Sequence, residues 1–185
     1  MNATASLSSG LLCVRYRRLG DRLAHEIGTI DGDSFYPVLE SIEGTPVDAW
    51  PASPPMQQIV EESIGASLSP VLLGVGLSGN GHWSIAIESQ NTSSLKFDVA
   101  CKNSKPSLWF GSKYRVSTEW VVANAIDSKI ELSHSKRECV PTTLQLLATI
   151  GQLRYDESDR TIAIVPASDP GKMLTHRWCY RIGIG

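Results

Sequence analysis

The sequence predicts a mainly β protein, folded as a single antiparallel β-sandwich or a closed β-barrel with one packed α-helix at about 54–65. Three observations lead to this fold class. Apolar and polar residues alternate through three consecutive segments between residues 71 and 101, which is typical of strands with one buried face. Turn-forming residues separate many other short apolar runs. A content of 42% hydrophobic and 19% charged residues indicates a folded globular chain.

The 185 residues are enough for one domain with a sizeable core. We assign residues 11–185 to a single β-rich domain. Residues 1–10 are rich in Ser, Ala and Thr and are expected to form a flexible N-terminus. Two strands follow at 11–18 and 22–30, joined by a turn at Gly20–Asp21, so the domain opens with a β-hairpin.

The next strand and the single helix are separated by a long loop. The segment 34–42 is a predicted strand, which Pro37 confines to a sheet edge or a bulge. Residues 43–55 contain several prolines and are predicted to form a loop. Ser53 can then cap a helix. Its apolar face has helical spacing and consists of Met56, Ile59, Val60 and Ile64.

The central alternation places one set of apolar side chains on a common buried face. Its members occupy the odd positions Val71, Leu73, Val75, Leu77, Trp83, Ile85, Ile87, Leu95, Phe97, Val99 and Cys101. If these apolar side chains keep to one face through the first hairpin, its turn must contain three residues, 79–81. A shift of one residue in the pairing would move every side chain of one strand to the other face. This turn would contain a positive-φ glycine and place Leu77 opposite Trp83.

The second hairpin leaves two registers open, one with Glu88 opposite Lys96 and one with Ser84 opposite Asp98. A cross-strand ion pair contributes only about 0.2–1 kcal/mol, so charge alone does not select between them. Residues 140–150 fit a strand or a helix, and their threonines favour the strand. Further strands are predicted at 108–116, 120–125, 129–133, 161–166 and 173–184.

Charge, cysteine spacing and hydropathy argue against several classes of protein. The formal net charge of −2 gives no global attraction to nucleic acid or to an anionic membrane. The four cysteines lie far apart and lack the spacing of a metal site, so neither a metal nor another cofactor is expected. No apolar run is long enough for a membrane span, and residues 1–10 do not resemble a signal peptide. These features predict a soluble cytoplasmic protein with no membrane partner.

The even-numbered face of the central segments carries the candidate chemistry. His82 and Asp98 could form an acid–base pair, because a carboxylate can orient and charge an imidazole. Ser84 lies two positions from His82 and would complete a hydrolase-like group. Glu88 and Lys96 on the same face are candidate ligand-binding residues. The alternative is a plain solvated face, which antiparallel sheets commonly present.

Two further features are candidates for ligand or partner binding. Gly74 and Gly76 lie on this same even face, where small residues permit the close approach of a ligand or of another element such as the predicted helix. Trp50 lies in the proline-rich loop and could anchor a partner. The alternative for Trp50 is that it covers a sheet edge.

Basic residues form another candidate surface. They are Arg15 and Arg17, Lys113 and Arg115, and Arg177 and Arg181, each pair on a predicted strand. If these strands are neighbours, their shared face could bind phosphate or single-stranded nucleic acid. The isoelectric point near 6.1 is low for such a binder, so nucleic acid is not the expected partner.

We therefore predict a non-enzymatic module that binds a small ligand or another protein. The first alternative is a hydrolase or lyase that uses His82 and Asp98. The second is a binder of anions or nucleic acid on the basic face. A long unpaired edge strand would also favour a homo-oligomer.

Overall fold

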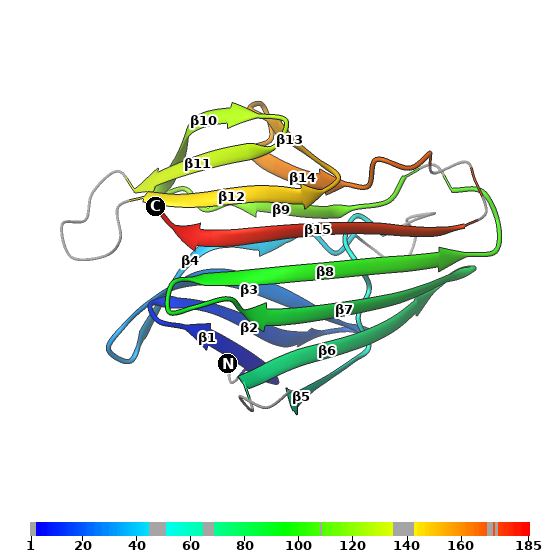
Figure 1. The fold of residues 1–185 in the computed structure, drawn as a ribbon, viewed down its shortest axis with the longest axis horizontal. Coiled ribbons are helices and arrows are strands. Elements are labelled where there is room, and N and C mark those ends of the chain that lie inside the picture. The colour runs from blue at the N-terminus through cyan, green and yellow to red at the C-terminus, as the bar shows by residue number, and fades with distance from the viewer. Residues whose placement is uncertain are drawn as a thin grey trace.

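The chain forms two antiparallel sheets that pack as a sandwich (Figure 1). The computed structural model describes residues 3–44, 51–64, 69–107, 109–134, 143–169, 172 and 174–185, and these contain no helix and no closed barrel. The first sheet has seven strands, in the order β1 (Ala5–Ser9), β2 (Leu12–Leu19), β3 (Arg22–Asp31), β4 (Ser34–Ser41), β9 (Ser112–Val116), β14 (Thr161–Val165) and β13 (Gln152–Asp156).

The second sheet has eight strands. Their order is β10 (Trp120–Ile126), β11 (Lys129–His134), β12 (Thr143–Ile150), β15 (Thr175–Ile184), β8 (Ser94–Asn103), β7 (Gly81–Ser89), β6 (Ser69–Ser78) and β5 (Gln58–Ile64). The sandwich prediction is therefore confirmed, whereas the barrel alternative is wrong.

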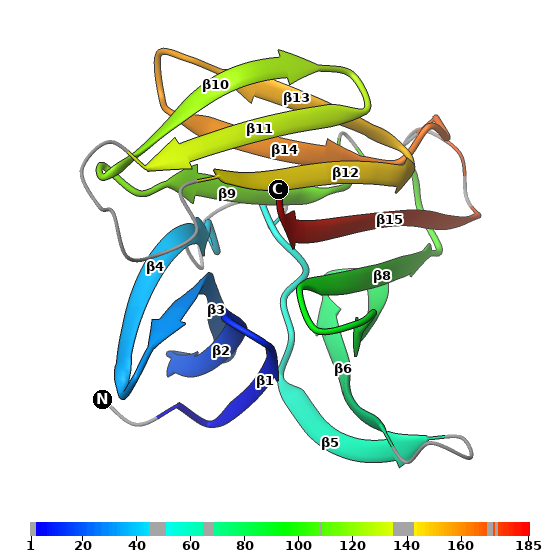
Figure 2. The same ribbon diagram turned by 60° about the vertical axis from the view of Figure 1, so that its left-hand side comes forward.

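The core lies between the two sheets and is rich in aromatic side chains. Figure 2 shows β1–β4 and β5–β8 facing each other in the lower part of the molecule, with β9–β14 together in the upper part. Phe97 of β8 stacks on Tyr180 of β15, with ring centroids 4.8 Å apart. Trp83 of β7 meets Trp178 of β15 edge-on at 6.0 Å. The odd positions of β7 and β8 face this core, as their alternation predicts.

The register of β6 differs from the prediction. Its turn to β7 has two residues, Gly79–Asn80, and the pairing places Leu77 opposite His82 rather than opposite Trp83. Gly79 has a φ of 55°, which suits the first central position of a type II′ turn. The shorter turn moves the odd side chains of β6 to the outer face, so Leu77 is 58% exposed.

The inner face of β6 is filled by the segment that precedes β5. A Cβ atom at Gly76 would lie 2.0 Å from the carbonyl oxygen of Pro55, and one at Gly74 would lie 3.1 Å from Sδ of Met56. The Met56 side chain is only 1% exposed and occupies the core where a larger side chain of β6 would otherwise lie. The two glycines thus permit the close crossing of two backbones.

The predicted helix at 54–65 is wrong, because Gln58–Ile64 form the edge strand β5. Ile59 is half-buried whereas Val60 is 50% exposed, which is the alternation of a strand. Antiparallel pairing with β6 supplies the backbone partners, and the β-branched side chains suit a strand. Tertiary pairing therefore outweighs the helical spacing of the apolar residues.

The connection before β5 is hydrogen-bonded to both sheets. The N–H of Leu23 in β3 donates to the carbonyl oxygen of Met56 at 2.7 Å. The N–H of Gln57 donates to the carbonyl oxygen of Val75 in β6 at 3.0 Å. This connection therefore joins the seven-stranded and eight-stranded sheets at one side of the sandwich.

Other sequence predictions can be compared directly with the strands. The segment expected to be a flexible terminus contains β1, which pairs with β2. The pairing of β3 with β4 shifts beside Pro37, where a bulge is expected. The strand alternative for 140–150 is confirmed over Thr143–Ile150. In the hairpin of β7 and β8, Glu88 lies opposite Lys96, which is the first of the two open registers.

Candidate functional site

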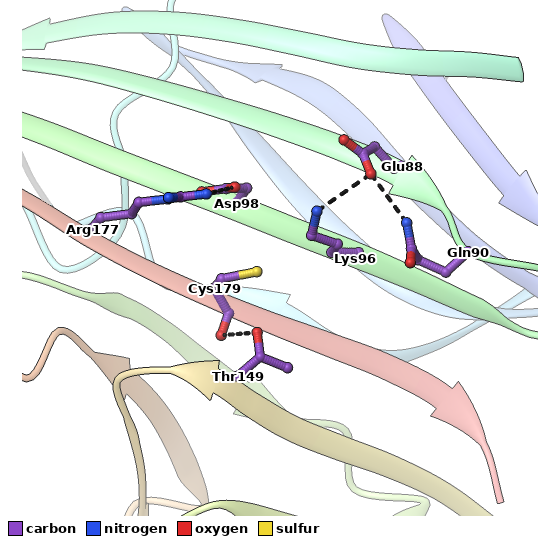
Figure 3. A network of polar contacts seen from close by, with 7 residues as sticks. All are labelled: Glu88, Gln90, Lys96, Asp98, Thr149, Arg177 and Cys179. Atoms are coloured by element: carbon purple, nitrogen blue, oxygen red, sulfur yellow. Dashed lines mark hydrogen bonds and ion pairs between the residues drawn. The ribbon is translucent and has the colours of Figure 1, made fainter. Parts of the chain in front are cut away.

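The outer face of the eight-stranded sheet holds most of the polar residues that the sequence analysis selects, and it pairs them with one another (Figure 3). Arg177 of β15 donates from Nε and Nη2 to the two carboxylate oxygens of Asp98 in β8, at 2.8 and 2.5 Å. Nζ of Lys96 lies 3.4 Å from Oε2 of Glu88 in β7. Both carboxylates therefore have a cationic partner on a neighbouring strand.

The Asp98 carboxylate acts as a cross-link between β8 and β15. Hydrogen bonds from Arg177 lower the pKa of Asp98, and the charges of Arg177 and Lys96 act in the same direction against partial desolvation. Asp98 is therefore ionised at neutral pH, and both of its oxygens already accept hydrogen bonds. Such a carboxylate is a weak general base.

His82 and Asp98 share a face but do not lie next to each other. His82 is opposite Lys102 of β8, whereas Asp98 is opposite Ala86 of β7. The two positions are four residues apart along the strands, which is about 13 Å at the usual strand rise. Ser84 lies midway between them in the pairing. The structure therefore does not assemble the His82, Ser84 and Asp98 group.

Among the remaining candidates from the sequence, Gly76 lines a hollow of about 410 Å³ together with His82 and Gln57. Gly74 and Gly76 face the core rather than the polar face, and the segment before β5 covers them. This corrects their placement and agrees with the alternative in which another element approaches them. Trp50 lies outside the described residues. Glu88 and Lys96 are engaged in the ion pair above.

A trough on the seven-stranded sheet is a more open candidate site. Arg154 of β13 lines two adjoining hollows of about 780 and about 370 Å³. We call the two together the β13 trough. The first hollow is also lined by Lys113, Tyr155, Asp156, Glu157, Ser158, Thr161 and Ala163, and the second by Trp109, Phe110, Gln152, Val165, Pro166, Ala167, Ser168 and Asp169.

The middle of the trough is one row of three paired residues. Arg154 of β13 lies opposite Ala163 of β14, and Ala163 lies opposite Lys113 of β9. Alternate residues of a strand share a face, and both cations line the same hollow. A methyl group therefore forms the floor between two long basic side chains.

One end of the trough is an acidic turn. The backbone N–H and the hydroxyl of Ser158 donate to Oδ1 of Asp156 at 3.0 and 2.7 Å. The hydrogen bond from the Ser158 side chain is the largest effect that lowers the pKa of Asp156. Asp156 therefore carries a negative charge at neutral pH, and Glu157 lies beside it in the same hollow.

The other end of the trough contains an aromatic side chain. Trp109 is half-buried, and its ring lies against Gly111, where a Cβ atom would be 2.8 Å from the ring. Gln152 lines the same hollow and offers both a donor and acceptors. Ser168 also lines it, and its hydroxyl is hydrogen-bonded at 2.7 Å to Nδ1 of His176, which orients it.

Sequence reasoning missed the main members of this trough. Arg154 lies in a segment with no assigned element, although Gln152–Asp156 alternate in polarity as a strand does. The strand predicted at 108–116 includes Trp109, whereas β9 begins only at Ser112. Of the trough residues, the sequence points only to Lys113, as part of the predicted basic surface.

The predicted basic surface is divided between the two sheets. Arg17 of β2 forms an ion pair with Glu40 of β4 at 2.9 Å. The guanidinium of Arg15 lies 4.2 Å from the centre of the Phe35 ring. Arg177 is bound to Asp98 on the opposite sheet. These pairings argue against the single continuous basic surface that the sequence suggests.

A polar network crosses the core and links the two sheets. Nε2 of His25 in β3 is hydrogen-bonded at 2.7 Å to the hydroxyl of Tyr114 in β9, which is hydrogen-bonded to the hydroxyl of Tyr180 in β15. Burial lowers the pKa of His25 to about 3, so the imidazole is neutral at physiological pH. Burial also raises the pKa of Tyr180 above its usual value. All three side chains are buried, so we assign this network a structural role.

In the described ranges, no three His, Cys, Asp or Glu side chains are grouped closely enough to hold a metal ion. None of the described segments forms a helix with the length and apolar character that a bilayer crossing requires.

The fold defines an antiparallel β-sandwich domain, and the comparisons with known proteins agree only at this level. One matching solved structure is described as heparinase III, with a TM-score of 0.51 and 9% sequence identity. The match covers 98% of this chain but only 35% of that chain, so the present chain spans about a third of its length. No family model matches, and no curated protein matches. The likeness concerns the fold alone.

Proposed function

We propose that this chain is a non-enzymatic ligand-binding β-sandwich module, and that it binds an oligosaccharide along the β13 trough. The observation that carries this proposal is that Arg154 lines two hollows, one shared with Ser158 and the other with Gln152. Sites for compact small molecules usually bury most of their ligand in one apolar cavity. A shallow trough with polar walls fits an extended polar chain better.

The groups along the trough suit a sugar chain. Aromatic rings offer a broad apolar face, on which the C–H face of a sugar ring can stack, and Trp109 supplies one at the trough's end. Gln152 and Ser158 can exchange hydrogen bonds with hydroxyl groups on either side of Arg154. The solved structure that shares the fold is named a heparinase, and this supports testing saccharides first.

The other predicted functions have less support. A hydrolase or lyase that uses His82 and Asp98 would need these side chains to move together, against the Arg177 hydrogen bonds that hold Asp98. A cytoplasmic location remains a prediction. It is supported by Cys13, Cys101 and Cys179, which are free and buried.

The proposal is tested by native affinity electrophoresis in gels that contain a polysaccharide. The panel comprises dextran, xylan, hyaluronan, alginate, polygalacturonate and heparin. We expect at least one polymer to retard the chain. Trp109→Ala should abolish most of that retardation, because the stacking face is lost. Gln152→Ala should weaken it less, since one hydrogen-bonding group is removed.

Ser84→Ala is the matched control, because Ser84 is an exposed polar residue on the other sheet. Its retardation should equal that of the unaltered chain. If no polymer changed the migration of the chain, the proposal that it binds an oligosaccharide would be rejected. Equal retardation of the Trp109→Ala and unaltered chains would place the ligand elsewhere.

A further inference from the structure

We infer that the ligand of the β13 trough carries an isolated acidic group, a carboxylate or a sulfate, flanked by neutral units, and that this group lies on Ala163 between Lys113 and Arg154. The inference rests on the proposed function and specifies its ligand class. It follows from the position of each charge along the trough.

The row across the middle of the trough is built to hold one anion. Neighbouring strands are about 4.8 Å apart, so the backbones at Lys113 and Arg154 are about 10 Å apart with Ala163 between them. Two long cationic side chains can close over an anion in that interval. Ala163 has only a methyl group, which leaves room above the sheet for the ligand.

Both cations are available for a ligand. Arg17, Arg22 and Arg177 form ion pairs with carboxylates, and so do Lys96 and Lys129. Across the described residues, neither Lys113 nor Arg154 takes part in such a pair. The charge of Lys113 helps to lower the pKa of Asp156, but Oδ1 of Asp156 accepts its hydrogen bonds from Ser158. An anion between the two cations would therefore meet donors that no carboxylate has taken.

Carboxylates at both ends limit where the ligand can be charged. Asp156 and Glu157 line the first hollow, and Asp169 lines the second together with Trp109. A second anionic group at either end would lie beside a like charge, which disfavours binding. A polymer with a charge on every unit, such as a nucleic acid or heparin, is thus a poor fit. A chain that alternates acidic and neutral units is a good one.

The test extends the electrophoresis panel with chemically matched ligands. Each carboxylated polymer is run beside its carboxyl-reduced form, which keeps the sugar chain but removes the charge. We expect carboxyl reduction to weaken retardation at least tenfold, because hydrogen bonds to charged groups are lost. Hyaluronan, which alternates acidic and neutral sugars, should retard the chain more than heparin or a single-stranded oligonucleotide does.

Three variants test whether Lys113 and Arg154 bind the acidic group of the polymer. Arg154→Gln and Lys113→Gln should each weaken binding to the acidic polymer about tenfold and weaken binding to its reduced form much less. Arg181→Gln makes the same change of charge on the outer face of the eight-stranded sheet and should have no effect. Circular dichroism and thermal unfolding of each variant establish that it is folded.

The outcomes separate the two proposals. Equal retardation by an acidic polymer and its reduced form would show that the ligand needs no acidic group. The proposal that a saccharide binds in the trough would remain. Stronger retardation by heparin or by the oligonucleotide than by hyaluronan would contradict the inference that the ligand carries an isolated acidic group. If no polymer retards the chain, the proposed function fails, and this inference fails with it.

Discussion

At the scale of single residues, Glu43 is a buried carboxyl group with a raised pKa. It follows β4, its residue is only 5% exposed, and Oε1 accepts a 2.5 Å hydrogen bond from the hydroxyl of Ser41. Oε2 has no hydrogen-bond partner among the described residues. Burial raises the pKa of Glu43 from 4.5 to about 7, although the Ser41 bond and the charges of Arg22 and Arg17 oppose this.

Glu43 should therefore make stability depend on pH. The unfolded chain releases this proton near pH 4.5, whereas the folded chain holds it until about pH 7. The protonated group thus stabilises the fold fully below pH 4.5, and this contribution is lost as pH rises through 7. Compared with Glu43→Gln, the unaltered chain should lose about 3 kcal/mol of unfolding free energy between pH 4.5 and 8. Urea unfolding at several pH values measures this difference.

The comparison with a variant is needed because His25 acts in the opposite direction. Its lowered pKa makes the fold lose stability as pH falls from 6.5 towards 3. His25 is present in both chains, so subtracting their profiles isolates Glu43. Glu62→Gln, which removes an exposed carboxylate on β5, should reproduce the unaltered profile. A Glu43→Gln profile parallel to the unaltered one would show that Glu43 is ionised in the folded chain.

At the scale of elements, the inner face of β6 is shaped by the segment that crosses it. Gly76 lies where the backbone of Pro55 passes, and Met56 fills the adjoining core. The apolar side chains of Val75 and Leu77 consequently point outward and are 53% and 58% exposed. Around Val75 and Leu77, β6 thus buries the face opposite to the one that its alternation predicts.

Gly76→Ala should therefore be strongly destabilising. The added Cβ would lie 2.0 Å from the carbonyl oxygen of Pro55, and backbone cannot move aside as a side-chain end can. We expect a loss of about 3 kcal/mol or more in urea unfolding, the upper range for overpacking. The control Ser84→Ala, on the outer face of the neighbouring strand β7, should stay within about 0.5 kcal/mol. A fully stable Gly76→Ala chain would mean that residues 55–57 do not cross β6 there.

At the scale of the whole molecule, β5 is the end strand of the eight-stranded sheet and is mostly exposed. Unpaired edges favour association between copies. Full antiparallel overlap of two β5 strands would place Glu61 directly opposite Glu61 of the other copy, whereas each Glu62 would lie opposite Val60 and diagonal to the other Glu62. Like charges directly opposite each other destabilise such pairing. These glutamates therefore oppose the homo-oligomer that an edge strand would otherwise form.

We expect a monomer at neutral pH, and a chain with both Glu61→Gln and Glu62→Gln should associate. Sedimentation velocity over a range of concentrations measures the difference. A chain with Asp31→Asn and Asp33→Asn has the same change in net charge at the exposed turn between β3 and β4, and it should remain monomeric. Dimers of the unaltered chain, or monomers of the Glu61/Glu62 variant, would contradict the role given to these glutamates.

The sequence alone determined the fold class and several strands of the sandwich. Period-two alternation is a property of local backbone geometry, so Trp83, Ile85 and Ile87 were identifiable as core residues of β7 without any tertiary information. The hairpin of β2 and β3 and the bulge beside Pro37 follow from local chemistry in the same way. Such features depend only on neighbouring residues.

Only the tertiary structure decided the identity of β5, the register of β6 and the candidate site. The helical spacing near Met56 lost to strand pairing, because partner strands and a crossing segment outweigh a weak local preference. The β13 trough combines Arg154 and Ala163, which lie on the two strands of one hairpin, with Lys113 of β9, which is far from both in the sequence. Their convergence depends on the strand order of the sheet, which no local pattern specifies.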